Sequence, residues 1–548
     1  MLAFVVLLGI AYVLPGLVGH DPWKPDEAYS FGMIYHILNA GDWVVPMVAG
    51  EPFMEKPPLY YVSAAYMAKL LFSWMPLHDA ARLTSGIYTA VTLALVGLSA
   101  RANWGDGHGS LAVMILLGSL GLVAHSHMMY TDTALLTGFA LAFYGLILSR
   151  TQVVVAGLAL GTGVGMGFMS KGLIAVGMIG CIAVLLPVFA AWRNRAYLRC
   201  LMVALIAAAP WLTIWPFALY QRSPELFMQW FWINNIGRFF GFAHLGASTE
   251  PWFCAETLLW FAFPALPLAL WTAWQLKWEE LKQPAFQLPA LAFVVMVVIL
   301  GVSRSARAVY MLPLLLPLSV LAAGGARSLP RRFAATADWL CRVVFGLLAV
   351  ALWWCWIEMA LQGRPPEWAW LAAYLPMDFK PVFQGAALAV AVALTLAWAL
   401  LLYTLNKWNI RPVISWVAGL TLVWGLLLTL WLPWLDSAKS YREVFASMQR
   451  ALPLGSGCVA SLHLGESERA MLEYMAGVVS VRREIEADAA CDLILVQSRN
   501  GTQEQASEHG WRLIWEGNRP GDSREGFRLF AREPLARARL DGDSSQIE

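Results

Sequence analysis

Long apolar segments recur along most of this chain, and polar residues gather in the connections between them. A helix needs about 20 apolar residues to cross the hydrocarbon core of a bilayer. Thirteen segments meet this requirement, and they predict thirteen transmembrane helices. The segments lie at roughly 1–19, 82–100, 110–128, 132–149, 152–169, 172–192, 200–218, 252–274, 285–302, 308–325, 339–358, 381–404 and 412–434. The first has no basic flank and no small-residue cleavage pattern, so we interpret it as a retained span.

Composition supports a polytopic membrane protein. Hydrophobic residues make up 59% of the 548 positions and charged residues only 14%, whereas soluble domains carry about 25% charged residues. The net charge of +2 indicates no particular partner. No basic arm or aromatic-basic stripe is present, so we predict no nucleic-acid partner.

The distribution of Lys and Arg predicts the orientation of the spans. One alternating set of connections is short and basic, which is typical of cytoplasmic loops. The other set contains the long loops 20–81, 219–251 and 359–380. Thirteen spans then leave the amino terminus inside and residues 435–548 outside, on the same outer face as the long loops.

Residues 435–548 differ in composition from the rest of the chain. Helical and short buried-strand patterns alternate in "ERAMLEYMAG", "VVSVRRE" and "CDLILVQS", which predicts a small α/β domain with a disordered end. It contains no glycine-rich nucleotide loop. Cys458 and Cys491 are its two cysteines. If the domain is extracytoplasmic, the two could form a disulfide, and the sequence does not decide this. The predicted organisation is a membrane domain, 1–434, followed by this domain.

The first outer loop, about 20–81, carries charged residues next to prolines. In "DPWKPDEAYSFG", Pro25 suits the first turn of a helix, and Asp26 and Glu27 then lie where the helix dipole favours negative charge. We predict a helix over 25–39 that lies in the membrane interface. Asp26 is either a solvated carboxylate that complements this dipole or a functional group.

A second charged pair occurs in "MEKPPLYY", where Glu55 and Lys56 precede two prolines. The prolines keep the preceding backbone extended, and a second interfacial helix is predicted to follow. Lys56 either reaches toward lipid headgroups or binds an anionic ligand.

Five motifs, in this order, resemble those of one glycosyltransferase superfamily. They are "PDEAYSFGMIYHILNAGDWVVPMVAGEPFMEKPPLYYV", "YTDTALL", "GFMSKGLIA", "PELFMQWFWINNIGRFFG" followed by "EPW", and "SRSARAVYMLPLLLPL". The chain resembles the GT-C glycosyltransferases that use polyprenyl-phosphate sugars. It is most similar to the lipid A aminoarabinose transferase family, which is related to the protein O-mannosyltransferases. The motifs span nearly the whole membrane part and lie on the predicted outer face.

The resemblance implies an α-helical polytopic GT-C fold in a bacterial inner membrane, with the active site and the C-terminal domain on the periplasmic side. It implies transfer of a sugar such as 4-amino-4-deoxy-L-arabinose from undecaprenyl phosphate to lipid A or a related envelope glycan. The partners would be that donor, the acceptor and membrane lipids. Three alternatives remain: a protein O-mannosyltransferase-like enzyme with a hydroxyl acceptor, a non-catalytic flippase for polyprenyl-linked sugars, and a structural envelope protein whose tail binds a partner.

This chemistry assigns roles to charged residues of the motifs. Fixed cations stabilise the charge that builds on a departing phosphate, and Lys56 and Arg238 are the candidates. A carboxylate near the anomeric carbon takes a proton or stabilises oxocarbenium character. Asp26 is the first candidate, followed by Glu27 and Asp132. An ionised phosphate acceptor needs no base, whereas a hydroxyl acceptor does, and the sequence does not decide between them.

Other motif residues are predicted to line the acceptor path or the cavity: Lys171, Arg304, Arg307 and Tyr310. Two arginines on an outer face run against the positive-inside tendency, so an anionic partner is expected there. The alternative to a functional role is an interfacial anchor for Lys171 and a cap of the fourth span for Asp132.

No cofactor is required by this chemistry, and a divalent metal such as zinc stays open. Glu55 either pairs with Lys56 or ligates a cation together with His244, although Glu and His without a spacing signature are a weak metal signal. Where the family often carries histidine, this chain has Asn234 and Asn235.

Overall fold

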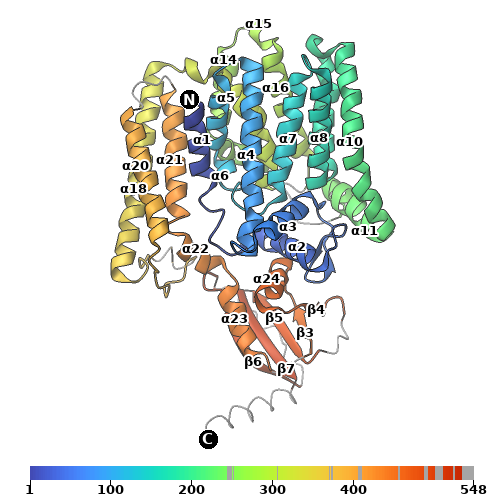
Figure 1. Ribbon diagram of the computed structural model, residues 1–548, viewed down its shortest axis with the longest axis vertical. Coiled ribbons are helices and arrows are strands. Elements are labelled where there is room, and N and C mark those ends of the chain that lie inside the picture. The colour runs from blue at the N-terminus through green and yellow to red at the C-terminus, as the bar shows by residue number, and fades with distance from the viewer. Residues whose placement is uncertain are drawn as a thin grey trace.

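The computed structural model describes the chain except for residues 244–249, 251, 305–306, 369–370, 372–373, 405–409, 454–456, 487–490, 500–509, 523–524 and 533–548. Most described residues form a bundle of roughly parallel and antiparallel helices, and a smaller domain lies at one end of it (Figure 1). We call this end of the bundle the domain end. The predicted helical membrane fold with a small C-terminal α/β domain is confirmed.

Each of the thirteen predicted segments coincides with at least one helix. The bundle helices are α1 (Leu2–Val13), α4 (Leu77–Trp104), α5 (His108–Leu117), α7 (Thr131–Leu148), α8 (Val153–Lys171), α9 (Leu173–Leu185), α10 (Arg195–Arg222), α13 (Phe253–Phe261), α14 (Ala265–Gln275), α16 (Pro284–Val302), α17 (Leu315–Gly325), α18 (Arg331–Gln362), α20 (Gly385–Thr404), α21 (Arg411–Leu427) and α22 (Leu432–Lys439). Shorter helices are α2 (Asp26–Ala40), α3 (Leu59–Leu71), α6 (Leu120–Val123), α11 (Pro224–Met228), α12 (Arg238–Phe240) and α15 (Trp278–Leu281), with a π-helical segment at Gln229–Gly237 and a 3₁₀ segment at Ala308–Leu314.

The predicted number of spans is not confirmed. Among the described residues, eight helices are long and apolar enough to cross a bilayer, or up to ten if two bent pairs each form one span. The bent pairs are α13 with α14, at 90°, and α21 with α22, at 63°. The remaining predicted segments, 1–19, 110–128 and 172–192, contain shorter apolar helices, because polar or helix-breaking residues interrupt them.

Close packing of α7 against α8 depends on small residues. A side chain on Gly163 of α8 would come within 2.5 Å of the backbone oxygen of Gly138 in α7, and one on Gly145 of α7 within 2.8 Å of Ala156 in α8. Small residues let membrane helices approach closely. The two helices run antiparallel, so the first turn of α7 and the last turn of α8 meet at the domain end.

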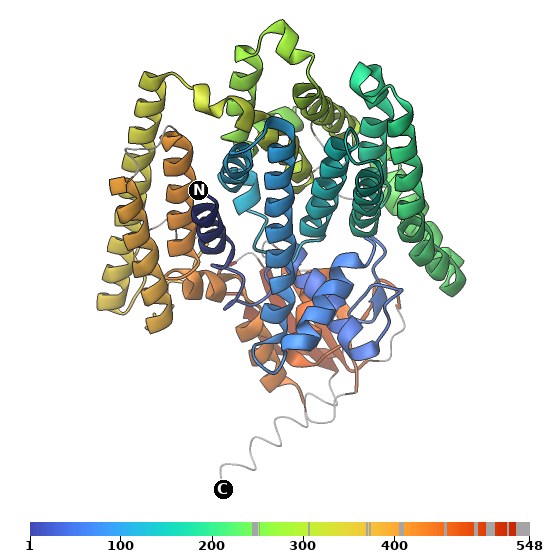
Figure 2. The same cartoon turned by 45° about the horizontal axis from the view of Figure 1, so that its top comes forward.

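The first long loop fills the space between the bundle and the C-terminal domain (Figure 1, Figure 2). It forms α2, a hairpin of β1 (Met47–Val48) and β2 (Glu51–Pro52), and α3. Helix α2 ends where Gly41 adopts a left-handed conformation, at φ 70°, a common helix end. Most of α2 is buried in contact with α3 and with α24 of the C-terminal domain, so it packs on protein along much of its surface.

The C-terminal domain is a five-stranded mixed sheet with helices on one face. The strand order is β4-β3-β5-β7-β6, with β3 parallel to β4 and β5, and β7 antiparallel to β5 and β6. The elements are α23 (Arg442–Ala451), β3 (Val459–Leu462), α24 (Glu466–Ala476), β4 (Ser480–Arg482), β5 (Leu493–Arg499), β6 (Trp511–Asn518) and β7 (Glu525–Arg532). The predicted disordered end falls among residues outside the described part of the chain.

A disulfide joins Cys458, just before β3, to Cys491, just before β5. Replacing both by serine is expected to destabilise the C-terminal domain by about 2–4 kcal/mol, because the crosslink restricts the unfolded chain. Limited proteolysis of the full chain in increasing urea measures this. Cys355→Ser in α18 is the matched control, and an unchanged cleavage midpoint in the double variant would contradict the prediction.

Candidate active site

Two neighbouring cavities share a wall at the domain end. The larger has a volume of about 390 Å³, and the smaller about 150 Å³. Lys56 and Tyr310 line both of them. The cavities therefore meet at a lysine ammonium and a tyrosine ring.

The larger cavity combines an apolar wall with three cations. Its apolar side chains come from α7, α9, α16 and the segment around α12, and they include Leu135, Phe139, Ile174, Met178, Phe239 and Leu300. Lys56, Lys171 and Arg238 line the same cavity. An apolar cavity with a few convergent polar groups is typical of a ligand site, and these cations select for an anionic ligand with a long apolar part.

Lys56 is buried, and its ammonium donates a hydrogen bond to the hydroxyl of Tyr29 at 3.0 Å. Burial alone would lower the pKa of Lys56, but nearby acidic groups, Glu55 among them, outweigh burial and raise the pKa above its usual value. The lysine is therefore charged at neutral pH. Glu55, which the sequence pairs with Lys56 or a metal, instead accepts a hydrogen bond from Arg238 at 2.6 Å.

Asp26 is the first residue of α2 and lines the smaller cavity. Both of its oxygens accept hydrogen bonds from Arg307, one at 2.8 Å, and the hydroxyl of Tyr29 donates to it as well. Burial would raise the pKa of Asp26, but the hydrogen bonds from Arg307 and the charge of Lys56 hold it at about 2. Asp26 is thus a fixed anion and a poor proton acceptor at neutral pH.

Asp132 and Lys171 form an ion pair between the facing ends of α7 and α8. The ammonium of Lys171 also lies 3.7 Å from the ring centre of Tyr310, a favourable cation–π contact. The side chains of both members of the pair are largely buried. Asp132 therefore does not serve as a helix cap, and Lys171 does not reach toward lipid, because the two side chains are paired with each other inside the protein.

The turn after Lys171 is held by Asn235, the second of two adjacent asparagines in the sequence. Gly172 has φ 77°, and Asn235 accepts a hydrogen bond from the backbone N–H of Leu173 at 2.9 Å while donating to the backbone oxygen of Trp230 at 2.8 Å. A side chain on Gly172 would come within 2.0 Å of the Asn235 amide oxygen. Asn235 thereby positions the turn that carries Lys171.

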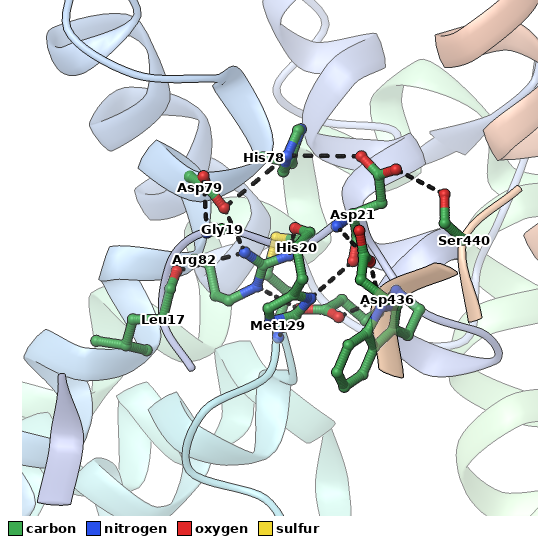
Figure 3. A network of polar contacts seen from close by, with 12 residues as sticks. Leu17, Gly19, His20, Asp21, His78, Asp79, Arg82, Met129, Asp436 and Ser440 are labelled. Carbon is green, nitrogen blue, oxygen red and sulfur yellow. Dashed lines mark hydrogen bonds and ion pairs between the residues drawn. The ribbon is translucent and has the colours of Figure 1, made fainter. Parts of the chain in front are cut away.

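Glu27 lies outside both cavities. Its carboxylate is completely buried and accepts hydrogen bonds from Arg82 at 2.7 Å and from the backbone N–H groups of Trp23 and Met129 at 3.0 and 3.2 Å. Arg82 also donates to Asp79 at 2.7 Å (Figure 3). Glu27, a catalytic candidate from the sequence, therefore has a structural role in holding Arg82. It does not face the cavity that Asp26 lines, because successive residues of a helix point in different directions.

Glu27→Ala is expected to destabilise the fold by about 3 kcal/mol, since it leaves the buried Arg82 charge with an incomplete set of partners. Thermal unfolding of the detergent-purified chain, followed by size-exclusion chromatography, measures the effect. Asp106→Ala, which breaks the exposed pair with Arg101, is the matched control and is expected to change little. Equal unfolding temperatures for the two variants would refute this structural role.

The remaining predicted residues divide between the cavities and other places. Arg307 lines the smaller cavity and Tyr310 both. Arg304 is exposed and lines neither cavity, and its backbone N–H donates a hydrogen bond to the backbone oxygen of Phe239 at 3.3 Å. His244 falls outside the described residues.

The described residues do not fit a metal site. They contain no group of three His, Cys, Asp or Glu side chains close enough to hold an ion. The carboxylate of Glu55 is engaged by Arg238.

The sequence did not assign three residues to this site. His125 and Tyr130 line the smaller cavity, and Tyr29 donates a hydrogen bond to Asp26. Tyr29 lies three residues after Asp26 in a helix, so helical spacing could have indicated that the two share a face. His125 and Tyr130 lie between α6 and α7, where no periodic pattern points to them. Burial lowers the pKa of His125, so its imidazole is neutral at neutral pH.

Comparisons with known proteins show which proteins this chain resembles. The family model of dolichyl-phosphate-mannose-protein mannosyltransferases matches residues 55–215, a range that contains Lys56, Asp132 and Lys171. An undecaprenyl phosphate-alpha-4-amino-4-deoxy-L-arabinose arabinosyl transferase of Pseudomonas paraeruginosa is 28% identical over 446 residues, which cover 77% of this chain and 74% of the relative. The enzyme of the same name from Serratia proteamaculans is 26% identical over 419 residues, covering 67% and 73%.

The fold has a solved counterpart. The crystal structure of ArnT from Cupriavidus metallidurans bound to undecaprenyl phosphate aligns with a TM-score of 0.69 and 14% sequence identity, covering 96% of this chain and 97% of the other. The fold is that of this membrane glycosyltransferase structure, and in sequence the chain is similar to the aminoarabinose transferases and, over residues 55–215, to the dolichyl-phosphate-mannose-protein mannosyltransferases.

Proposed function

We propose that this protein transfers 4-amino-4-deoxy-L-arabinose from undecaprenyl phosphate to lipid A, at the periplasmic face of a bacterial inner membrane. The names of the relatives support the sugar and the lipid carrier. The structural counterpart bound to undecaprenyl phosphate supports the same donor. The alternating basic connections support the orientation.

The observation that carries the proposal is the wall shared by the two cavities. An undecaprenyl chain is apolar and suits the apolar wall of the larger cavity, whereas its phosphate needs the three cations there, Lys56, Lys171 and Arg238. The sugar bonded to that phosphate then reaches the smaller, polar cavity with Asp26 and Asp132. Lys56 borders both cavities and lies where the bond between sugar and phosphate would break.

The proposed reaction is a displacement at the anomeric carbon. An oxygen of the acceptor forms a bond to this carbon from one side while the bond to the donor phosphate oxygen breaks on the other, which inverts the configuration. Undecaprenyl phosphate leaves with the bonding electrons, and the cations stabilise its added charge. Asp26, held ionised, stabilises positive character on the sugar ring.

The charge state of Asp26 favours a phosphate acceptor over a hydroxyl acceptor. A phosphate of lipid A is already ionised and loses no proton in the transfer. A general base works best when its pKa lies near the operating pH, and Asp26 at about 2 is far from it. This argues for lipid A over the hydroxyl side chains that a protein O-mannosyltransferase-like enzyme would use.

Purified protein incubated with radiolabelled undecaprenyl-phosphate sugars and a panel of acceptors tests the proposal. The panel contains intact lipid A, lipid A without phosphates, and a peptide rich in Ser and Thr. Label is expected only on intact lipid A and only from the aminoarabinose donor. Because protein cations meet the phosphate charge, EDTA is expected to leave the rate unchanged. Transfer to the peptide, or no transfer from any donor, would reject the proposal.

A further inference from the structure

The C-terminal domain meets the two loop segments that carry Asp26 and Lys56. Its helix α24 packs directly on α2: a side chain on Gly32 of α2 would come within 2.6 Å of the Ala470 side chain of α24. The rings of Phe31 and Tyr474 pack edge to face at 4.7 Å. One hydrophobic cluster includes residues of α2, α3, α24 and the sheet, so the domain shares a core with the first loop.

The first turn of α24 contacts the chain immediately before Asp26. Ser467 donates a hydrogen bond to the backbone oxygen of Pro25 at 2.7 Å. Glu468, the next residue, forms an ion pair with Lys24, and Glu525 of β7 adds a second pair to Lys24 at 2.7 Å. Glu468 and Glu525 are both buried. The two residues that precede α2 are therefore fixed by the C-terminal domain.

The same turn contacts the hairpin that precedes Lys56. Arg469 follows Glu468 directly, is buried, and forms an ion pair with Glu51 at 3.0 Å. Arg482 at the end of β4 donates a hydrogen bond to the other oxygen of Glu51 at 3.2 Å. Glu51 lies in β2, only a few residues before Glu55 and Lys56.

Further contacts attach the domain to the same loop. Asp21 is paired with Arg442 of α23 and accepts a hydrogen bond from Ser440 at 2.6 Å (Figure 3). Asp436 of α22 accepts hydrogen bonds from the backbone N–H of Asp21 at 3.0 Å and from the indole of Trp23 at 2.8 Å. Residues 21–25 are thus bonded almost one after another to the last part of the chain.

We infer that the first turn of α24, Ser467 to Arg469, is a positioning element that sets the distance between Asp26 and Lys56 in the active site. Three consecutive residues hold one segment through Lys24 and Pro25 and the other through Glu51. None of the three lines either cavity, so they act through the segments that they hold. Through this turn the domain then affects the geometry of the active site and is not an accessory tail. This inference rests on the proposed function for its kinetic test.

Arg469→Gln is the central variant. A misplacement of reacting groups by about 1 Å can cost a factor of 10² in rate, so kcat is expected to fall about 10- to 100-fold. The donor KM is expected to stay within about threefold, because the cations still bind the phosphate. Arg469→Lys keeps the charge and is expected to retain kcat within about threefold. Arg528→Gln, which removes an arginine paired with Glu516 on the sheet of the same domain, is the matched control and is expected to match the wild type.

Glu51→Gln tests the same contact from the loop side and leaves the domain's own fold untouched. It is expected to lower kcat to a similar extent as Arg469→Gln. The double variant is expected to be no worse than the poorer single variant, because each single variant already lacks the pair between Arg469 and Glu51. Losses that multiply in the double variant would overturn the inference, as would kcat within twofold of wild type in both single variants.

Hydrogen exchange tests the positioning without any activity. In Arg469→Gln, backbone amides of residues 47–56 are expected to exchange about tenfold faster than in the wild type, with no change in Arg528→Gln. Unchanged exchange in this segment would overturn the inference. A wild-type protein that transfers no aminoarabinose would instead reject the proposed function, and the exchange measurement would still decide the positioning role.

Discussion

Lys56→Met is expected to lower kcat by about 10²- to 10³-fold, which is the loss typical of removing one preorganised charged or hydrogen-bonding group from a dry active site. Lys56 is buried and borders both cavities. Methionine keeps the length and apolar contacts of the side chain. Without the ammonium, Glu55, Asp26 and Asp132 would face the departing phosphate with less compensating charge. Single-turnover transfer from labelled donor measures the chemical step.

The matched control is Lys69→Met, in the last turn of α3. This lysine is exposed, so its loss is expected to leave kcat unchanged. Size-exclusion chromatography in detergent establishes that both variants are folded. If Lys56→Met kept kcat within about threefold of the wild type, the placement of the reacting phosphate at this lysine would be wrong.

Asp26→Asn is expected to lower kcat by about 10²-fold or more with little change in fold, because the amide keeps the shape but loses the charge. Arg307 would then have only a neutral partner, and the site would no longer favour positive character on the sugar. Initial rates with the aminoarabinose donor measure the loss. Glu279→Gln, at an exposed carboxylate of α15, is the matched control.

The pH dependence separates an electrostatic role of Asp26 from a role as base. Its pKa is lowered from the ordinary value of 3.8 to about 2, so its ionised form persists down to that pH. The stability that its ionisation contributes is present above the ordinary pKa and lost only as pH falls toward about 2. The kcat profile is therefore expected to show no limb from Asp26 between pH 5 and 8. A limb in this range that Asp26→Asn removes would contradict the electrostatic role.

Local patterns along the chain predicted much of the architecture. Each apolar segment coincides with helix, because a backbone in lipid must satisfy its own hydrogen bonds. The alternating short patterns after residue 435 predicted the small sheet domain. The number of true spans was less predictable, since the bends between α13 and α14 and between α21 and α22 depend on how the helices pack.

The motif residues were found from the sequence, but their partners were not. Asp26 and Glu27 are adjacent and chemically alike, yet one lines a cavity and the other is sealed beside Arg82. The pair of Asp26 with Arg307 joins residues 281 positions apart. A local sequence pattern covers far fewer positions, so it could not predict this pair.

By itself, the sequence determined the membrane class, the helical segments, the existence of the sheet domain and the acids and bases that its motifs share with a family. These depend on apolar length and on chemistry that each residue carries alone. Only the tertiary structure decided which charges face the cavities, because that depends on close helix packing, such as α7 against α8, and on the contact of α24 with the first loop. Ion pairs and pKa values arise from neighbours in space, and the chain order does not specify those neighbours.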